Sequence, residues 1–112
     1  MNIEFRKTGE VVVARVIDRR FDAHGAADFK ARVGEHLDRG ERKLVLDLGE
    51  VDFVDSSGLG AILSVVRRMS GTGSLMLSDC RPGVLELMKL TRLDRVFQIV
   101  GTADEAVKLL AG

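Results

Sequence analysis

Residues 43–69 read KLVLDLGEVDFVDSSGLGAILSVVRRM, which joins an apolar run to a turn of small polar residues and then to a second apolar segment. The run Lys43–Leu48 is bounded by charge and by Gly49, which is the pattern of a buried strand. Apolar residues then recur at helical spacing, so a helix is predicted with Ser56 at its start. Its expected buried stripe is Leu59, Ile62, Leu63, Val66 and Met69. A buried strand that leads directly into a helix is typical of α/β domains.

The segments on either side extend this pattern. Upstream, a hairpin of two strands is predicted around the turn Thr8–Glu10, followed by an amphipathic helix from Ala26 to Gly40. Downstream, the pattern predicts a strand at 75–77, a helix opened by Pro82, a strand at 96–100 and a helix that starts with the capping box Thr102-x-x-Glu105. The order ββαβαβαβα implies an α/β domain with a mixed sheet, and residues 1–112 are expected to form one domain.

Composition excludes several classes of function. Lys plus Arg and Asp plus Glu number 17 each, so no net charge attracts the chain to nucleic acid or to an acidic membrane. Cys80 is the only cysteine, and with two histidines the chain has no zinc-type ligand set, so neither a metal nor a cofactor is expected. The N-terminal residues lack the apolar run of a signal peptide, and no stretch is apolar enough to span a membrane. We therefore expect a reduced, cytoplasmic protein.

The turn Asp55-Ser56-Ser57-Gly58-Leu59-Gly60 carries the candidate chemistry. A serine at a helix start can accept a hydrogen bond from a free backbone N–H, and the same N–H groups, with the helix dipole, suit a phosphate. Ser56 is therefore a candidate both as helix cap and as phosphate acceptor. The two glycines would let the backbone of another protein approach closely. A purely structural interpretation, with polar caps and glycines for tight packing, explains such a junction equally well when it is taken alone.

Over nearly its whole length the sequence resembles the anti-sigma-factor antagonists, which are single-domain STAS proteins. The resemblance is strongest over residues 51–63, where an acid, a phosphorylatable Ser, a second Ser and Gly-Leu-Gly follow one another. It implies a mixed sheet of four or five strands with helices mainly on one face. It also implies a bacterial, non-enzymatic switch in transcription regulation: an ATP-dependent anti-sigma-factor serine kinase modifies Ser56, and a serine phosphatase of the metal-dependent type restores it.

The resemblance extends to a loop after the second strand, where the family commonly has Gly-x-x-Asp. Asp22 matches the acid, whereas Arg19 replaces the glycine. By this resemblance the expected partner-binding residues are Asp22, His24, Asp55, Ser57, Gly58, Leu59 and Gly60. Asp22 as a simple helix cap is an equally good interpretation. Arg19 and Arg20 are either partners for a phosphate on Ser56 or a solvated basic pair.

Three alternatives remain beside this interpretation. A dinucleotide site is disfavoured because Gly58-x-Gly60 would need Gly or Ala at Leu63. A serine hydrolase, with His24 or His36 as base, is disfavoured because neither Ser56 nor Ser57 has the Gly-x-Ser-x-Gly surroundings of a nucleophile elbow; His36 is expected on the helix surface. A STAS module that binds a partner without ever being phosphorylated also remains open.

Overall fold

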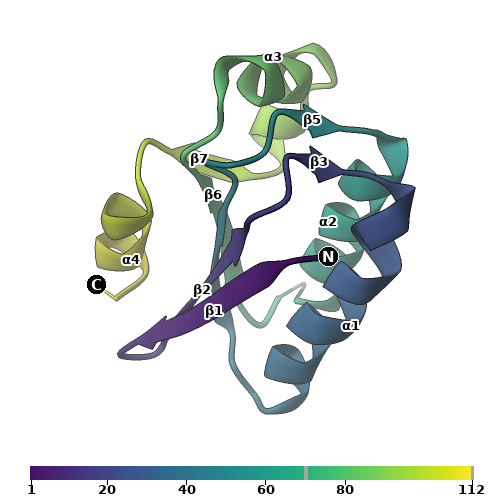
Figure 1. Ribbon diagram of the computed structural model, residues 1–112. Coiled ribbons are helices and arrows are strands. Elements are labelled where there is room, and N and C mark those ends of the chain that lie inside the picture. Colours follow the sequence, from purple (N-terminus) through teal and green to yellow (C-terminus); the bar gives the residue numbers. More distant parts are fainter. Residues whose placement is uncertain (70, 112) are drawn as a thin grey trace.

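The computed structural model describes residues 1–69 and 71–111, and a five-stranded sheet lies at its centre (Figure 1). Across the sheet the strands are β1 (Ile3–Thr8), β2 (Val11–Val16), β4 (Lys43–Asp47), β6 (Ser74–Ser78) and β7 (Gln98–Val100). β1 and β2 pair antiparallel through a turn in which Gly9 has a φ of 61°, and the other neighbours pair in parallel. The predicted hairpin and mixed sheet are confirmed.

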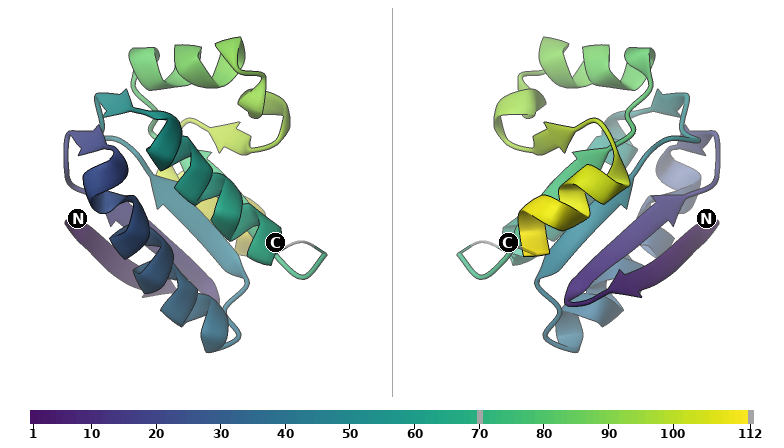
Figure 2. Two further views of the ribbon diagram at one scale, coloured as in Figure 1. Left: turned by 90° about the vertical axis from the view of Figure 1, so that its right-hand side faces the viewer. Right: turned by 90° about the vertical axis from the view of Figure 1, so that its left-hand side faces the viewer.

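Helices cover the two faces of the sheet unequally (Figure 2). α1 (Ala23–Asp38) and α2 (Ser56–Arg68) pack side by side on one face, and α4 (Ala103–Ala111) lies on the other. α3 (Pro82–Leu90) and the short 3-10 helix η1 (Leu93–Arg95) lie beyond the carboxyl ends of the strands. α1 connects β2 to β4 and α2 connects β4 to β6, so both connections run in the same direction across the sheet. Because such connections between parallel strands are right-handed, they place both helices on the same face. The predicted fold class is confirmed, with α4 as the helix on the opposite face.

The sheet separates a large core layer from a small one. The larger layer, on the side of α1 and α2, includes Val12, Leu46, Leu77, Phe29 and Ile62. The smaller layer, under α4, is formed by Val11, Val13, Val45, Met76, Ala103, Ala106 and Leu110. Consecutive residues of a strand point to opposite faces of the sheet. Since one core layer covers each face, β2 and β4 are buried on both sides. This double burial explains their unbroken apolar runs.

Two very short strands, β3 (Arg20–Phe21) and β5 (Phe53–Val54), form a second parallel sheet near the carboxyl ends of the main strands (Figure 1). Phe21 is opposite Val54 in this pair, and both side chains are buried. β3 leads into α1 and β5 leads into α2. The sequence pattern does not predict these strands, because a two-residue strand has no periodicity to detect.

The buried side of α2 differs from the predicted stripe. The fully buried residues of the helix are Gly58, Ala61, Ile62 and Val65, and Met69 just after it is also buried. Leu59, Leu63 and Val66 are only half-buried at the edge of the core. The prediction followed the largest apolar side chains, whereas close contact with β3 and β5 selects small residues at the centre of the interface.

Several predicted boundaries also move by a few residues. α1 begins at Ala23 rather than Ala26, and β7 begins at Gln98 because η1 precedes it. One of the two bonds of the predicted capping box is confirmed, since the Glu105 N–H donates to Thr102 Oγ1 at 3.1 Å. Glu105 Oε2 accepts instead from the N–H of Gly101, the residue before Thr102, at 3.2 Å. In the described part of the chain, none of the helices has the length and apolar character needed to cross a membrane.

Candidate functional site

Ser56 is the first residue of α2 and is exposed, as is Ser57. The cap of the helix, however, is Asp55, whose Oδ1 accepts a hydrogen bond from the Gly58 N–H at 2.9 Å. The prediction that Ser56 itself caps the helix is therefore wrong. Asp55 takes the position because its extended backbone places a carboxylate over the free N–H groups of the first turn. The Ser56 hydroxyl is consequently not required for capping.

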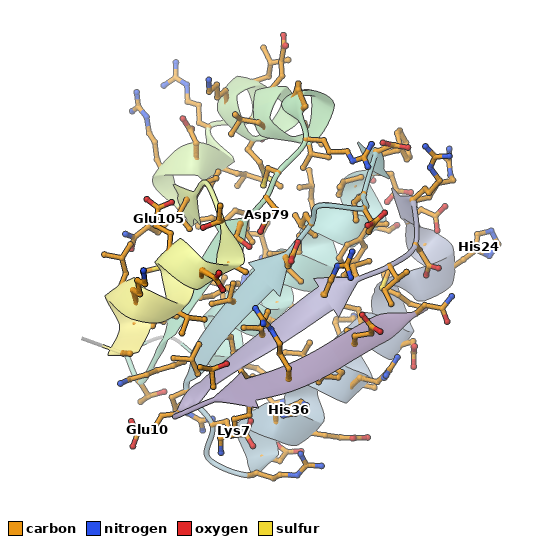
Figure 3. The ribbon with its side chains drawn as sticks, turned by 60° about the vertical axis from the view of Figure 1, so that its left-hand side comes forward. Lys7, Glu10, His24, His36, Asp79 and Glu105 are labelled. Carbon is orange, nitrogen blue, oxygen red and sulfur yellow. The ribbon has the colours of Figure 1, made fainter. Side chains whose placement is uncertain are left out.

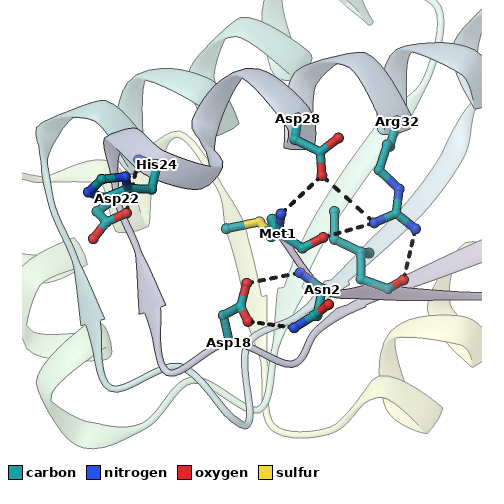
Figure 4. Close-up of polar contacts among 8 residues, drawn as sticks. Met1, Asn2, Asp18, Asp22, His24, Asp28 and Arg32 are labelled. Atoms are coloured by element: carbon teal, nitrogen blue, oxygen red, sulfur yellow. Dashed lines mark hydrogen bonds and ion pairs between the residues drawn. The ribbon is translucent and has the colours of Figure 1, made fainter.

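Asp22 occupies the equivalent position at the start of α1. Its Oδ1 accepts a hydrogen bond from the His24 N–H at 3.1 Å (Figure 4), so the helix-cap interpretation of Asp22 is correct. The two caps are neighbours because β3 and β5 pair immediately before them, and the Asp55 N–H donates to the Phe21 carbonyl oxygen at 3.2 Å. The short sheet therefore places the starts of α1 and α2, and the two acids, on one patch of the surface.

The middle of α1 is also tied to the start of the chain (Figure 4). The Arg32 guanidinium donates to the carbonyl oxygens of Met1 and Ile3 at 3.0 and 3.1 Å. The Asn2 N–H and side-chain amide donate to the two carboxylate oxygens of Asp18, at 2.9 and 3.0 Å. The first contacts join α1 to the beginning of the chain, and the second join Asp18, in the segment between β2 and β3, to Asn2.

The two glycines of the turn have different surroundings. A Cβ on Gly58 would lie 2.3 Å from the Phe21 carbonyl oxygen and 3.0 Å from Val54 Cγ1, so Gly58 is required for packing of α2 on the short sheet. Gly58 is buried, which does not fit the expectation that it contacts a partner. A Cβ on Gly60 would meet no atom within 4 Å, and Gly60 is exposed. Only Gly60 is thus free to serve an approaching protein.

Arg19 and Arg20 are both paired with acids. Arg19 Nε donates to Asp52 Oδ2 at 2.9 Å, while Arg20 Nε lies 3.4 Å from Asp22 Oδ2. The Arg20 guanidinium also lies over the Phe53 ring, 4.3 Å from its centre. Among the described non-glycine residues only Asp79 and Arg92 have positive φ, so Arg19 needs no glycine-like backbone at the position where the family has glycine.

Asp52 links three loops at this end of the molecule, and its role was missed by sequence reasoning. Besides Arg19, it binds Arg81, whose Nη1 donates to Asp52 Oδ1 at 3.0 Å. Arg81 Nε also donates to the Gly49 carbonyl oxygen at 2.7 Å. Charged residues in three separate loops carry no shared sequence signal, so only the folded chain reveals this brace. It holds the segment that leads into Ser56.

The two histidines lie in different environments. His24 is exposed in the first turn of α1 and points away from the body of the molecule (Figure 3). His36 is not the free surface residue that was predicted: its ring stacks on Phe5 at 4.3 Å between centres, and its Nδ1 lies 2.8 Å from Glu41 Oε2. His36 is also in the last turns of α1, about 20 Å along the helix from its start. It is therefore badly placed to act as a base for Ser56.

Leu59 lies at the edge of the same surface patch and is half-buried, so part of its side chain faces outward. Among the described residues, no group of three or more His, Cys, Asp or Glu side chains is arranged to hold a metal ion. The patch formed by Asp22, His24, Asp55, Ser56, Ser57, Leu59 and Gly60 is called the switch surface below. It combines an exposed hydroxyl, capped helix starts and an open glycine, which suits recognition by another protein.

Comparisons with known proteins identify the family to which the fold and the sequence belong. The STAS domain matches residues 2–106. A protein of Thermotoga neapolitana, provisionally named an anti-sigma factor antagonist, is 31% identical over 108 residues, which are 95% of this chain and 96% of the relative. A crystal structure of a protein from Thermotoga maritima with the same provisional name has a TM-score of 0.89 at 26% identity, covering 98% of this chain and 95% of that one.

The Bacillus cell fate determinant SpoIIAA, in its phosphorylated form, has a TM-score of 0.74 at 22% identity, over 96% of this chain and 97% of that one. At this identity the likeness shows a common fold. The family match, by contrast, extends over most of the chain and includes both helix starts of the switch surface. This chain belongs to the STAS domain family.

Proposed function

We propose that this protein is an anti-sigma-factor antagonist whose partner binding is controlled by phosphorylation of Ser56. Unphosphorylated, it binds an anti-sigma-factor serine kinase and thereby frees the sigma factor. The kinase transfers a phosphoryl group from ATP to Ser56, which releases the antagonist, and a serine phosphatase of the metal-dependent type restores the binding form. The observation that carries the proposal is the exposed Ser56 at the first position of α2, beside an acid that already caps the helix.

The relatives support the regulatory role. The Thermotoga neapolitana protein is provisionally named an anti-sigma factor antagonist, and SpoIIAA, which shares the fold, has a phosphorylated form. A role in binding rather than catalysis also fits the geometry at Ser56, because His36 is too far along α1 to act as a base and His24 points away from the body of the molecule. We therefore favour the switch over a hydrolase.

The position of Ser56 suits a phosphate. Its oxygens would lie near the positive end of the α2 dipole and near N–H groups of the first turn, which stabilises negative charge. Because Asp55 caps the helix through Gly58, the modification would not remove an existing helix cap. The serine hydroxyl can therefore be converted to a phosphate without cost to the helix.

The added charge acts on the partner rather than within the chain. Phosphorylation adds about −1.5 to −2 charges, and the nearby Arg19 and Arg20 are already paired with Asp52 and Asp22. A partner that covers the switch surface would have to bury this charge without a matching cation. We expect the kinase to release the modified protein for this reason.

The test compares Ser56→Ala, Ser56→Asp and the control Ser74→Asp, at an exposed serine of β6 outside the switch surface, for calorimetric binding to the purified cognate kinase. Ser56→Ala and Ser74→Asp should bind like the wild type, whereas Ser56→Asp should bind at least about tenfold more weakly, a loss of roughly 1.4 kcal/mol. Equal affinities for the Asp and Ala variants would refute control by charge at Ser56.

Mass spectrometry after incubation with the kinase and ATP separates the remaining possibilities. One phosphate on Ser56, absent from Ser56→Ala, is the expected result. A phosphate on Ser57 would overturn the choice of acceptor. Tight binding without any phosphorylation would instead favour the unregulated STAS module.

A further inference from the structure

β1 forms one edge of the main sheet and pairs with β2 on its other side (Figure 2). The Ile17 N–H donates to the Asn2 carbonyl oxygen at 2.9 Å, at the end of this hairpin. Because hydrogen-bonded and non-hydrogen-bonded pairs alternate along an antiparallel ladder, the even-numbered residues of β1 direct their backbone groups toward β2. The odd-numbered residues Ile3, Phe5 and Lys7 direct theirs outward. An edge of this kind is a template for a further strand.

Contacts within the chain leave this edge able to pair. The Arg32 guanidinium donates to the Ile3 carbonyl oxygen at 3.1 Å, but a carbonyl oxygen has a second lone pair for another donor. The charged side chains of β1 are exposed and only loosely paired. Glu4 Oε1 lies 3.6 Å from Arg15 Nη1, and Arg6 Nη2 lies 4.0 Å from Asp104 Oδ1. Exposed pairs of this kind contribute little to stability, so they can be exchanged for others.

The charges of β1 are complementary to those of a second copy of the same strand. Two copies related by a twofold axis pair their free edges antiparallel, with outward-directed residues opposite one another. If Phe5 is opposite Phe5 of the second copy, Ile3 is opposite Lys7, and Glu4 is opposite Arg6 on both sides of the axis. A shift by two residues places either Glu4 opposite Glu4 or Arg6 opposite Arg6. Charge therefore selects the register centred on Phe5.

The outer side of α1 has the same kind of symmetry. It carries a charged stripe of Asp28, Arg32, Glu35 and Arg39, the last being the C-cap of the helix. Spacings of four, three and four residues place these side chains on one side of the helix. That side faces β1, because Asp28 Oδ2 lies 3.1 Å from the N-terminus of Met1. In an antiparallel copy of the helix, Asp28 is opposite Arg39. Likewise, Arg32 is opposite Glu35.

The two centres of symmetry lie at the same place in the fold. The strand register is centred on Phe5, and the helix stripe is centred between Arg32 and Glu35. Phe5 lies against this part of α1: its ring centre is 5.4 Å from the Arg32 guanidinium carbon and 4.3 Å from the centre of the His36 ring. A single twofold axis that passes near Phe5, perpendicular to the sheet, therefore brings both complementary sets of charges together.

We propose that this protein forms a twofold-symmetric homodimer through the free edge of β1. The two main sheets join into one, and α1 packs beside α1 of the second copy on the same face. The partner is a second copy rather than a strand of another protein, because the strand and the helix stripe are each complementary to themselves. Such an interface uses the same surface of both subunits, as twofold dimers do. The dimer does not depend on phosphorylation of Ser56.

The test is sedimentation equilibrium of the full chain, at concentrations up to the millimolar range, for the wild type, Glu4→Arg and Arg6→Glu. The wild type should show a reversible equilibrium between monomer and dimer. Each variant alone places like charges opposite one another on both sides of the axis, so its dimer should be about tenfold weaker or more. In an equimolar mixture, each Glu4→Arg chain meets opposite charges on an Arg6→Glu chain. The mixed dimer should therefore regain about the affinity of the wild type.

Matched controls separate this interface from a general effect of charge. Glu86→Arg and Arg95→Glu make the same changes of charge at exposed residues outside β1 and α1, and both should dimerise like the wild type. Circular dichroism checks that every variant is folded. A wild type that stays monomeric over the whole concentration series would overturn the proposal. So would a dimer indifferent to Glu4→Arg and Arg6→Glu, or a mixture of these two variants that associates no better than either alone.

Discussion

Gly58 and Gly60 are two positions apart in α2, yet they should respond in opposite ways to the same substitution. Gly58→Ala forces a Cβ against the Phe21 carbonyl oxygen and should destabilise the protein by about 3 kcal/mol. Gly60→Ala adds a methyl group in open space within a helix and should stabilise it by about 0.5–1 kcal/mol. Urea denaturation followed by circular dichroism measures both changes.

The same pair tests the switch surface. If Gly60 admits the backbone of the kinase, Gly60→Ala should bind the kinase more weakly although it is the more stable protein. A gain in stability with unchanged affinity would show that Gly60 lies outside the contact. Gly58→Ala is no control for binding, because its fold is expected to be weakened.

Asp47 should make stability depend on pH. Burial of the carboxyl group raises its pKa above the ordinary value of 3.8, the nearby charge of Asp79 adds to the rise, and the Gly49 N–H opposes it. A raised pKa means that the folded protein holds the proton more tightly than the unfolded chain. The contribution to stability is therefore fully present below pH 3.8 and is lost as the pH rises through the folded-state pKa.

Asp47→Asn keeps an oxygen for the Gly49 N–H but has no charge to bury. We expect this variant to be more stable than the wild type at pH 7, with the difference disappearing at pH 3.5. Urea midpoints at the two pH values measure this directly. An identical midpoint for the two proteins at pH 7 would contradict the effect of burial.

At the scale of elements, β3 and β5 explain why the switch surface exists. Each short strand is followed directly by the residue that caps the next helix, and the pairing of the two strands holds Asp22 and Asp55 side by side. The Arg19–Asp52–Arg81 brace then fixes β5 against the loops around it. A rigid platform of this kind lets a partner bind without first having to order the surface, which favours affinity.

Phosphorylation of Ser56 should leave α2 intact. A negative charge at the first helical position is favoured by the helix dipole, and the cap between Asp55 and Gly58 does not involve the Ser56 side chain. We expect the far-ultraviolet circular dichroism of the phosphorylated protein to match that of the unmodified one. A large loss of helical signal would mean that the switch works by local unfolding instead of by charge at the contact.

At the scale of the whole molecule, both core layers depend on the same strands. β2 and β4 contribute one row of side chains to the α1/α2 layer and another to the α4 layer. We therefore expect α4 to unfold together with the rest in a single transition with a urea slope of about 1–2 kcal/mol per molar. The chain has neither Trp nor Tyr, so circular dichroism and the NMR methyl signals of Val45 and Leu110 are the suitable probes. Separate midpoints for these two residues would show that α4 is an independent unit.

The sequence by itself determined the α/β class, the hairpin, the main helices and the position of Ser56 at the start of α2. These features depend on local periodicity, turn residues and a contiguous motif, all of which are present in a single stretch of chain. The resemblance to the STAS family extended over nearly the whole chain and was strongest over one contiguous stretch, residues 51–63. Nothing in that stretch required knowledge of which other segments lie nearby.

Only the tertiary structure decided which acid caps α2, which glycine is open to a partner and which arginines are already paired. It also joined Asp47 to Asp79 and Asp52 to Arg81, which are separated by about thirty residues along the chain. The physical reason is that capping geometry, steric clearance and charge pairing depend on distances of a few ångströms between distant segments. Such distances arise when parallel strands come into register, and no local pattern records them.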